Sequence, residues 1–261
     1  MSRSTELSGN QRSDMMERPI DIKADAKRVF DIIEAGGIAI VPNDTGYALC
    51  STTTAPLKKI FEAKGRGDHK RNAMGADLKT QRTMLMLDKR GQAMVDTLVL
   101  DHDLPLGVIG PVNQDHPQIC KLDAELRRAS SAAGTVALLL NAGAFHNELA
   151  RLSREEEVPL LGSSANFSGT GTRFRVEDIP EELRAIADIT IDHGLRRAHI
   201  YKRAGTIINF NTMQVIRIGA YYEMISEVLK RWFDVELPSD PGLEALPSGH
   251  INEFVLKDVK D

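Results

Sequence analysis

Residues 134–169 read GTVALLLNAGAFHNELARLSREEEVPLLGSSANFSG. The apolar run Thr135–Leu140 predicts a buried strand, and the spacing of apolar residues over 144–154 predicts the helix that follows it. A second short apolar run at 158–161 leads directly into Gly162-Ser163-Ser164. A strand, a helix and a second strand in this order predict an α/β fold.

The rest of the chain extends this alternation. Helical spacing of apolar residues predicts helices over 24–35, 55–63, 89–97, 117–128 and 222–232. Apolar and β-branched runs predict strands over 37–42, 84–87, 188–192, 206–209 and 214–218. The last strands follow one another without helices, which favours antiparallel pairs. We therefore expect a twisted, mixed open sheet with helices on both faces, and a final helix that turns Trp232 inward.

Length and composition set the class of protein. The 261 residues are 42% hydrophobic and 27% charged, which fits one large domain with short appendages. We expect a flexible arm over 1–21, the main domain over 22–222, and a helix, linker and acidic tail over 223–261. The chain has two cysteines, no apolar run of 18 residues and no apolar segment typical of a secretory signal. These features predict a cytoplasmic protein without a membrane segment.

The charge is unevenly divided. The net charge is −4, but residues 234–261 contain seven acids and only two lysines. The remaining residues therefore carry a net charge of about +1, which is not typical of a strongly basic nucleic-acid binder.

Two distant segments carry the chemistry that a polyphosphate needs. Lys64-Gly65-Arg66 offers two cations at the end of a predicted helix, where Gly65 suits a left-handed cap. Ser163–Gly169 offers hydroxyls and the Asn166 amide just after a strand, where ligands of open α/β sheets bind. Fixed cations and short hydrogen bonds together hold phosphates. Each segment alone also suits a simpler interpretation, as a helix cap and as a polar turn.

Weaker candidates surround these two segments. Arg217 interrupts an apolar strand, Thr135 begins one, and Thr45 follows the end of one. Each side chain either contacts a ligand or stabilises its own strand or turn. The basic stretch 194–205 is either a solvated loop or a rim that attracts nucleotide or RNA phosphates. The histidines show no metal-ligand spacing, so we predict no metal site in the protein.

The order of the segments resembles the YrdC-like family of threonylcarbamoyl-adenylate synthases over about residues 22–222. Six short segments carry the resemblance: GGIAIVPNDTGYAL (36–49), IFEAKGR (60–66), GTVALLL (134–140), PLLGSSANFSG (159–169), GTIINF (205–210) and VIRIGA (215–220). The Lys-x-Arg and Ser-x-Asn motifs, in this order, are typical of the family.

The resemblance implies a concave, basic cleft and a reaction of ATP, bicarbonate and an amino acid. It implies that Mg²⁺ arrives with ATP and that the product serves the modification of a tRNA adenosine. Lys64 and Arg66 are the implied catalytic residues. The implied nucleotide-binding residues are Lys64, Arg66, Thr135, Ser164, Asn166 and Arg217. The implied amino-acid pocket contains Asn43, Thr45, Leu139 and Gly205.

The chain departs from the family mainly in the implied amino-acid pocket. Leu139 stands where the family usually has arginine, and Gly205-Thr206-Ile207 replaces a Ser-Thr-Val sequence. Asn43 replaces a usual threonine, and 67–72 replaces a proline-rich segment. We therefore hold three hypotheses: a nucleotidyltransferase that makes threonylcarbamoyl-adenylate or a similar compound, a module that binds nucleotide or double-stranded RNA without catalysis, and an enzyme that transfers a carbamoyl group to another acceptor.

Overall fold

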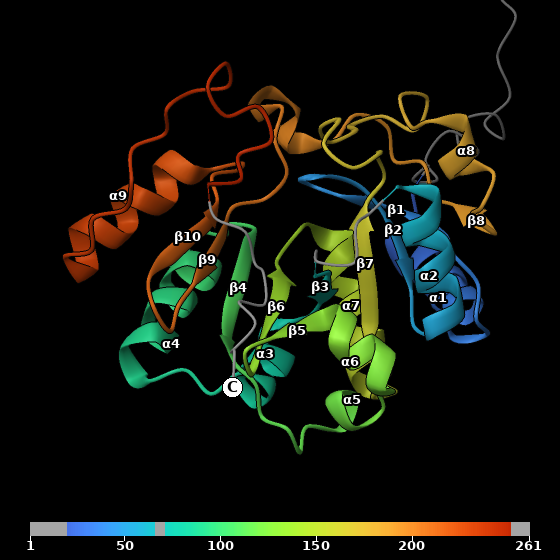
Figure 1. The fold of residues 1–261 in the computed structure, drawn as a ribbon, viewed down its shortest axis with the longest axis horizontal. Helices are drawn as coiled ribbons and strands as arrows, with labels where there is room; N and C mark the ends of the chain where they lie inside the picture. The colour runs from blue at the N-terminus through green and yellow to red at the C-terminus, as the bar shows by residue number, and fades with distance from the viewer. Residues whose placement is uncertain (1–19, 66–70, 252–261) are drawn as a thin grey trace, which may run out of the picture.

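The computed structural model describes residues 20–65 and 71–251, which form a mixed α/β fold (Figure 1). One sheet runs through it in the strand order β10-β9-β4-β6-β3-β7-β2-β1-β8, and β5 pairs with β6 beside this path. The strands are β1 Ala39–Asn43, β2 Gly46–Ser51, β3 Ala73–Gly75, β4 Leu106–Pro111, β5 Ser131–Ala132, β6 Thr135–Leu140, β7 Leu160–Ser164, β8 Ile189–Thr190, β9 Ile207–Asn209 and β10 Gln214–Arg217.

Helices connect and cover the strands. The α-helices are α1 Ile22–Glu34, α2 Thr54–Ala63, α3 Leu78–Met84, α4 Lys89–Asp96, α5 Pro117–Cys120, α6 Ala124–Ser130, α7 Ala144–Glu155, α8 Glu181–Arg184 and α9 Tyr222–Phe233, with a π-helix η1 Thr97–Asp101 and a 3₁₀-helix η2 Arg197–Tyr201. Aspartates begin several of them, because their carboxylates accept backbone N–H groups that have no partner inside the helix. Asp21, Asp77, Asp88 and Asp123 cap α1, α3, α4 and α6 in this way.

The sheet is mixed, as the sequence predicts. β1 and β2 form an antiparallel hairpin, and β4 pairs antiparallel with β6 and parallel with β9. β10 pairs antiparallel with β9, which confirms the expectation for the last strands.

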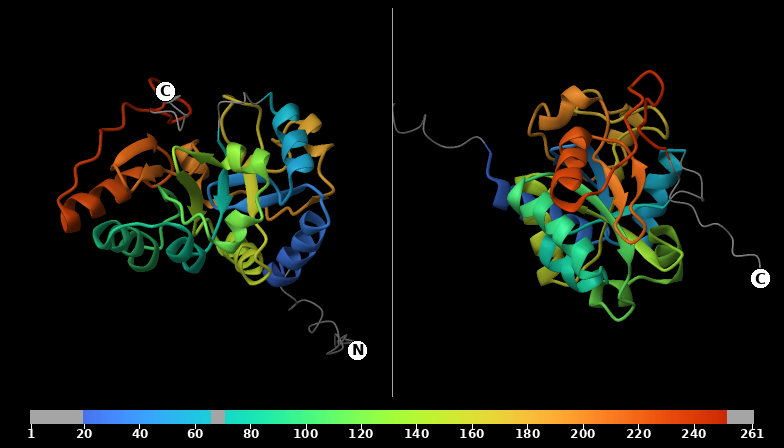
Figure 2. Two further views of the ribbon diagram at one scale, coloured as in Figure 1. Left: turned by 60° about the horizontal axis from the view of Figure 1, so that its bottom comes forward. Right: turned by 90° about the vertical axis from the view of Figure 1, so that its left-hand side faces the viewer.

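Helices cover both faces of the sheet, which also confirms the prediction (Figure 2). On β1, Ala39 and Val41 pack with α1 and α7, whereas Ile40, together with Ile38 just before the strand, faces the core shared with α2 and α8. This follows from the two-residue period of a strand, since successive side chains point to opposite faces. A larger core lies over the central strands and contains the apolar residues of α3, α4, η1 and α9.

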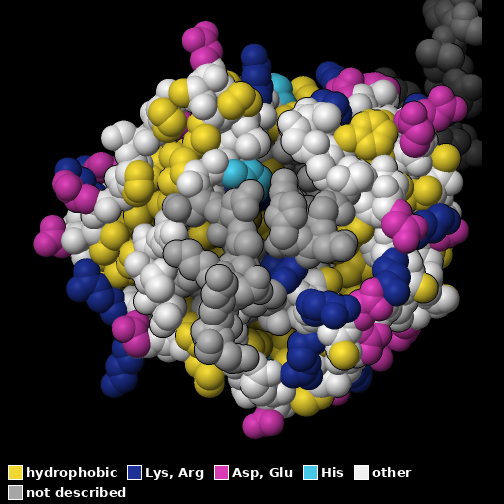
Figure 3. Space-filling view, in the orientation of Figure 1, with side chains coloured by type: hydrophobic (Ala, Val, Ile, Leu, Met, Phe, Trp, Pro, Cys, Tyr) yellow, Lys and Arg dark blue, Asp and Glu magenta, His cyan; other side chains and the backbone are white. Residues whose placement is uncertain are grey.

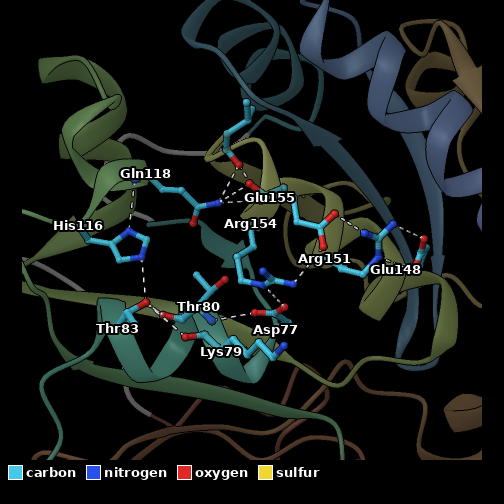
Figure 4. A network of polar contacts seen from close by, with 12 residues as sticks. Asp77, Lys79, Thr80, Thr83, His116, Gln118, Glu148, Arg151, Arg154 and Glu155 are labelled. Atoms are coloured by element: carbon cyan, nitrogen blue, oxygen red, sulfur yellow. Dashed lines mark hydrogen bonds and ion pairs between the residues drawn. The ribbon is translucent and has the colours of Figure 1, made fainter.

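A network of polar contacts fixes α7 against α3 and α5 (Figure 4). Arg154 on α7 forms an ion pair with Asp77 at 2.7 Å. Gln118 on α5 donates to the Ser153 carbonyl at 2.9 Å, and Arg151 forms an ion pair with Glu148 within α7. The helix is thus tied to its neighbours by side chains as well as by its apolar face.

Three local predictions are wrong. Residues 84–87 are not a strand: Met84 ends α3, and Leu85 makes only an isolated bridge to Val112. Residues 117–128 form two short helices, because Asp123 caps a new helix after α5 ends. Trp232 does not face inward; it is 65% exposed, whereas the neighbouring Phe233 is partly buried against the core.

No helix among the described residues is long and apolar enough to span a membrane. The proposed division into arm, main domain and tail remains a prediction, since residues 1–19 and 252–261 lie outside the described part.

Candidate functional site

A cavity of about 430 Å³ lies on one face of the sheet, which α7 covers in part. Its floor is formed by alternate residues of the central strands, including Gly107 and Ile109 of β4 and Ala137 and Leu139 of β6. The intervening residues Val108 and Val136 pack into the opposite core. The floor is thus apolar. Its glycines have no side chain that would take up space in the cavity.

Lys64 and the segment after β7 meet at one end of this cavity. The Lys64 ammonium donates to the backbone carbonyls of Ser164 and Asn166, and the Lys64 carbonyl accepts from the Ser168 amide at 3.1 Å. Gly65 lies at φ 57°, so it occupies the left-handed cap position that the sequence predicts. The two segments that the sequence singled out therefore join into one wall, although Lys64 is only 3% exposed.

Two polar atoms of this wall are buried without a hydrogen-bond partner among the described residues. The Asn166 amide donates to the Phe167 carbonyl at 2.6 Å, but its Oδ1 has no partner among the described residues. The Ser168 hydroxyl is also buried without a partner there. Buried polar atoms are normally satisfied, so these two are among the few unsatisfied polar atoms of the described residues, and both belong to residues that line the cavity.

Arg66 lies outside the described residues, so its predicted place beside Lys64 stays a prediction. Arg71 lines the cavity on the same side, and its Nε donates to the Ser131 carbonyl at 3.0 Å. The sequence analysis did not select Arg71 as a site residue; its place near the basic Lys64-Gly65-Arg66 segment was the available signal.

The four residues of the predicted amino-acid pocket, Asn43, Thr45, Leu139 and Gly205, all line the cavity. The part of the cavity beside Thr45 and Gly205 is called its amino-acid end after that prediction. A Cβ atom added to Gly205 would lie 3.5 Å from the Thr45 Cγ2, so the turn after β1 touches the start of β9. The sheet is therefore curved, so that the segment before β9 contacts the turn after β1, although these strands lie far apart in the strand order.

Asp44 fixes that turn through contacts of its carboxylate and of its backbone amide. Its carboxylate pairs with Arg197 at 3.0 Å and with Arg196 at 3.5 Å. A Cβ atom on Gly143 would lie 2.6 Å from the carboxylate, so only glycine fits there. The Asp44 amide donates to the Ala142 carbonyl at 2.7 Å. These contacts fix the backbone that carries Asn43 and Thr45.

The other two predicted nucleotide residues lie apart. Arg217 lines the cavity at its amino-acid end, where its Nε donates to the Gly205 carbonyl at 2.8 Å. Thr135 does not line the cavity; its hydroxyl donates to the Ala132 carbonyl at 2.7 Å and stabilises the turn between β5 and β6. The simpler interpretation of Thr135 fits this structure.

The charged side chains that line the cavity are all positive. The lining residues in the described part of the chain include Lys and Arg side chains but no Asp or Glu; the five cations are Lys64, Arg71, Lys202, Arg203 and Arg217. Figure 3 shows several Lys and Arg side chains close together on one face of the molecule, with Asp and Glu side chains next to some of them. Such a cavity favours anionic ligands, since low-dielectric walls of one charge strengthen the local field.

Much of the basic stretch 194–205 is engaged inside the protein. Arg203 is 4% exposed and pairs with Asp240 at 2.7 Å, and Arg196 donates to the Asn43 carbonyl at 3.1 Å. Only part of this stretch is thus available as a solvent-facing rim for RNA.

The chain after α9 returns to the cavity. We call residues 246–251 the strap. The Ile218 amide donates to the Gly249 carbonyl at 2.7 Å, and the Ile251 amide donates to the Ile216 carbonyl at 3.2 Å, so the strap lies along β10. Ser248 and His250 of the strap line the cavity. The predicted linker and tail therefore contribute a wall.

Comparison with known proteins identifies the fold. The solved structures with similar folds include a hypothetical protein, Smu.1377c, from Streptococcus mutans UA159 (22% identity, 80% of this chain and 92% of that chain, TM-score 0.68). They also include P. abyssi Sua5 complexed with L-threonine (20% identity, 85% and 61%, TM-score 0.64) and E. coli YciO (20% identity, 76% and 90%, TM-score 0.56). No curated protein matches the chain.

A family model provides the assignment. The Sua5/YciO/YrdC model, described as "Telomere recombination", matches residues 31–219. This range contains all the residues that line the cavity except those of the strap. The match covers more than half of the chain and agrees with the resemblance noted from the motifs. The chain therefore belongs to the Sua5/YciO/YrdC family.

Proposed function

We propose that this chain uses ATP, bicarbonate and an amino acid to form a carbamoyl-adenylate, as a threonylcarbamoyl-adenylate synthase does. The observation that carries the proposal is the charge of the cavity: five Lys and Arg side chains line it, and no described lining residue is an acid. ATP and a carbamate are both anions, and both require such an environment.

The proposed reaction has two steps. The amine of the amino acid attacks the carbon of bicarbonate, which forms a carbamate and releases water. A carbamate oxygen then attacks the α-phosphorus of ATP, the bond from the α-phosphorus to the bridging oxygen breaks, and pyrophosphate leaves. Mg²⁺ enters with ATP as part of the substrate.

The protein contributes position and charge in this proposal. Lys64, with Ser164, Asn166 and Ser168, forms the end that receives phosphates in this proposal, and Arg71 adds positive charge to the same cavity. Arg66, which lies outside the described residues, is proposed to act with them. Positive groups that are fixed before the reaction stabilise the charge that spreads over the reacting phosphate. Arg217 and Lys202 lie at the opposite end, where they suit the carboxylate of the amino acid. The apolar floor between the ends suits the adenine ring or an aliphatic side chain.

The relatives support this proposal by their fold and by what their structures contain. One similar structure is a Sua5 complexed with L-threonine, and another is HypF in a phosphate- and nucleotide-bound form (18% identity, TM-score 0.57). We further propose that the product serves tRNA adenosine modification in the cytoplasm.

A pyrophosphate-release assay tests the proposal. Purified protein would be incubated with ATP, Mg²⁺, bicarbonate and one amino acid at a time. Release that requires both bicarbonate and threonine supports the threonylcarbamoyl reaction, and release only with another amine assigns a different acceptor. Absence of release with every amine, together with binding of double-stranded RNA, would replace the proposal by the binding-module hypothesis.

A further inference from the structure

A second cavity, of about 230 Å³, lies beside the turn that follows β1. Asn43 and Thr45 line the first cavity, whereas Asp44 between them lines the second. The turn therefore separates the two cavities. No described residue lines both of them, so the second cavity is distinct from the site described above.

The second cavity lies at an edge of the sheet where ligands of open α/β folds bind. Asn141 and Gly143 line it and come directly after the end of β6. Tyr221 and Met224 line it from the segment after β10. β10 runs in the same direction as β6, because β10 is antiparallel to β9, β9 is parallel to β4, and β4 is antiparallel to β6. The carboxyl ends of both strands thus meet at this edge, which is the usual place of a binding site.

A series of contacts fixes the charged groups along the wall of this cavity. The Asn141 side-chain amide donates to the Asp103 carboxylate at 2.8 Å. Two residues later, a Cβ atom on Gly143 would lie 2.6 Å from the Asp44 carboxylate, which pairs with Arg197 at 3.0 Å. Asp103 and Arg197 therefore stand at the two ends of one series of contacts, and the loop 141–143 connects them.

Tyr221 is close to charged groups of both signs. Burial raises the pKa of Tyr221, so its phenol stays neutral; the charge of Arg197 lowers this pKa, and the charges of Asp44 and Asp103 raise it. The ring packs against Tyr201 with the two ring centroids 4.9 Å apart. The backbone of Tyr221 has φ 62°, which is uncommon for a bulky residue. A neutral hydroxyl is thus held in the lining of the cavity near both kinds of charge.

The charges of the second cavity are mixed, unlike those of the first. Its described lining contains the carboxylates of Asp44 and Asp103 and the guanidinium of Arg197. Asp44 is shared by two cations, because Arg196 also approaches it at 3.5 Å, whereas the partner of Asp103 among the described residues is a neutral amide. A purely anionic ligand would meet two carboxylates here, and a purely cationic ligand would meet a guanidinium. A ligand with one charge of each sign avoids both conflicts.

We propose that the second cavity binds a small zwitterion, a molecule that carries one ammonium and one carboxylate group, as a free amino acid does. The ammonium binds to the Asp103 carboxylate, and the carboxylate binds to the Arg197 guanidinium, whose planar fork matches two oxygen atoms. The Tyr221 hydroxyl donates to or accepts from the ligand between them. This inference does not depend on the proposed reaction, since the second cavity shares no described residue with the first.

The size of the cavity limits the ligand to a small molecule. Its volume of about 230 Å³ is below the range of sites that hold drug-sized ligands. The apolar part of the described lining, which would contact a short aliphatic group of the ligand, consists of Leu104, Pro105 and Met224. For a ligand of about six heavy atoms with two charge-assisted contacts, we expect a Kd of about 1 mM.

Titration by ¹H–¹⁵N NMR tests the proposal, because the backbone amide of Gly143 reports on the second cavity and that of Gly205 on the first. L-Alanine is the probe. Ethylamine lacks its carboxylate, and propionate lacks its ammonium. We expect L-alanine to shift the Gly143 amide in a saturable way. Each analogue should bind at least about tenfold more weakly than L-alanine, because it loses one charge-assisted contact.

Three variants assign the contacts. Asp103→Asn keeps an oxygen that can accept from Asn141 but removes the charge, and Arg197→Met removes the guanidinium. Each should weaken binding of L-alanine at least about tenfold. The matched control, Asp101→Asn, changes an exposed acid that lines neither cavity and should keep the wild-type Kd within about twofold. Arg197→Met also removes a partner of Asp44, so thermal melting checks that it is folded, and Asp103→Asn decides the matter if it is not.

Several results would overturn the inference. One is an unchanged Gly143 amide at about 50 mM L-alanine, roughly fifty times the expected Kd. Equal affinity for ethylamine or propionate would show that the site does not select a zwitterion, and wild-type affinity in Asp103→Asn would remove the proposed ammonium contact. The titration needs neither ATP nor pyrophosphate release. Failure of the proposed reaction would therefore leave this result unchanged, and failure of this test would leave the proposed reaction untouched.

Discussion

Gly205 and Thr45 come from opposite parts of the sheet, yet they touch: a Cβ atom on Gly205 would lie 3.5 Å from the Thr45 Cγ2 and 3.7 Å from its hydroxyl. The contact joins β9 to the hairpin of β1 and β2. It brings two residues of the predicted amino-acid pocket side by side in the lining of the cavity.

The first prediction follows from this contact. Gly205→Ala adds a methyl group at an ordinary van der Waals distance from Thr45. We expect the free energy of unfolding to change by less than about 1 kcal/mol, whereas kcat/KM falls about tenfold for the largest amino acid that the enzyme accepts. Urea unfolding and pyrophosphate release would measure the two effects. An equal loss for small and large amino acids would show that Gly205 does not limit the pocket.

The second prediction concerns the phosphate end. Lys64→Met removes a buried ammonium that holds the Ser164 and Asn166 carbonyls. We expect at least a 100-fold loss of ATP affinity, since a charge-assisted contact and the geometry of the wall are lost together. Equilibrium binding of a fluorescent ATP analogue would measure it, with the exposed Lys89→Met as control. Arg66→Ala should also abolish ATP binding. Wild-type affinity in both Lys64→Met and Arg66→Ala would refute this assignment of the phosphate end.

The third prediction concerns the support of the turn. Asp44→Asn removes the charge that pairs with Arg196 and Arg197 behind Thr45. We expect a loss of about 2 kcal/mol in unfolding free energy. Because Asn43 and Thr45 line the amino-acid end, KM for the amino acid should rise while KM for ATP stays within twofold. A rise confined to KM for ATP would contradict the placement of this turn.

The fourth prediction concerns pH. Burial lowers the pKa of His146 from 6.5 to about 4, so the unfolded chain binds this proton more readily than the folded protein does. Stability from this residue is therefore complete above pH 6.5 and falls as the pH drops toward 4. Between pH 7.5 and 5.0 it should account for about 2 kcal/mol of lost stability. Urea unfolding of wild type and His146→Phe at both pH values would measure this, and an equal loss in both would contradict it.

The fifth prediction concerns the strap. Gly249 lies at φ 75°, and a Cβ atom there would be 1.9 Å from the Ile218 carbonyl oxygen. Gly249→Ala should therefore detach the strap from β10 while the core stays folded. Hydrogen exchange of the Ile218 amide, which donates to Gly249, should become at least tenfold faster. Unchanged protection of this amide would show that the strap tolerates the side chain.

Local patterns predicted much of the fold. The apolar run Thr135–Leu140 coincides with β6, and the amphipathic stretch after it forms α7. These signals are strong because burial repeats along the element. The strand predicted over 84–87 was wrong because a short apolar run does not distinguish a helix from a strand. Met84 is the last residue of α3, and the residues after it form a loop. β2 was missed, although Asp44 and Gly46 in its hairpin turn are typical turn residues.

The candidate site was predicted less completely. Lys64 and Asn166 carry chemistry in recognisable motifs, so their meeting was predictable. His146 gave no signal in the sequence, because its burial in the cavity lining depends on how α7 packs over the sheet. Arg203 belongs to the basic stretch 194–205, but it forms an ion pair with Asp240 from the C-terminal segment. Such long-range pairing is set by tertiary contacts that no local pattern encodes.

The strap has a consequence for solubility. β10 is at one edge of the sheet, and an uncovered edge strand offers unpaired backbone groups to other molecules. The strap occupies the Ile216 carbonyl and the Ile218 amide, so it shields this edge from pairing with a second molecule. Loss of the strap would therefore promote self-association as well as open one wall of the cavity.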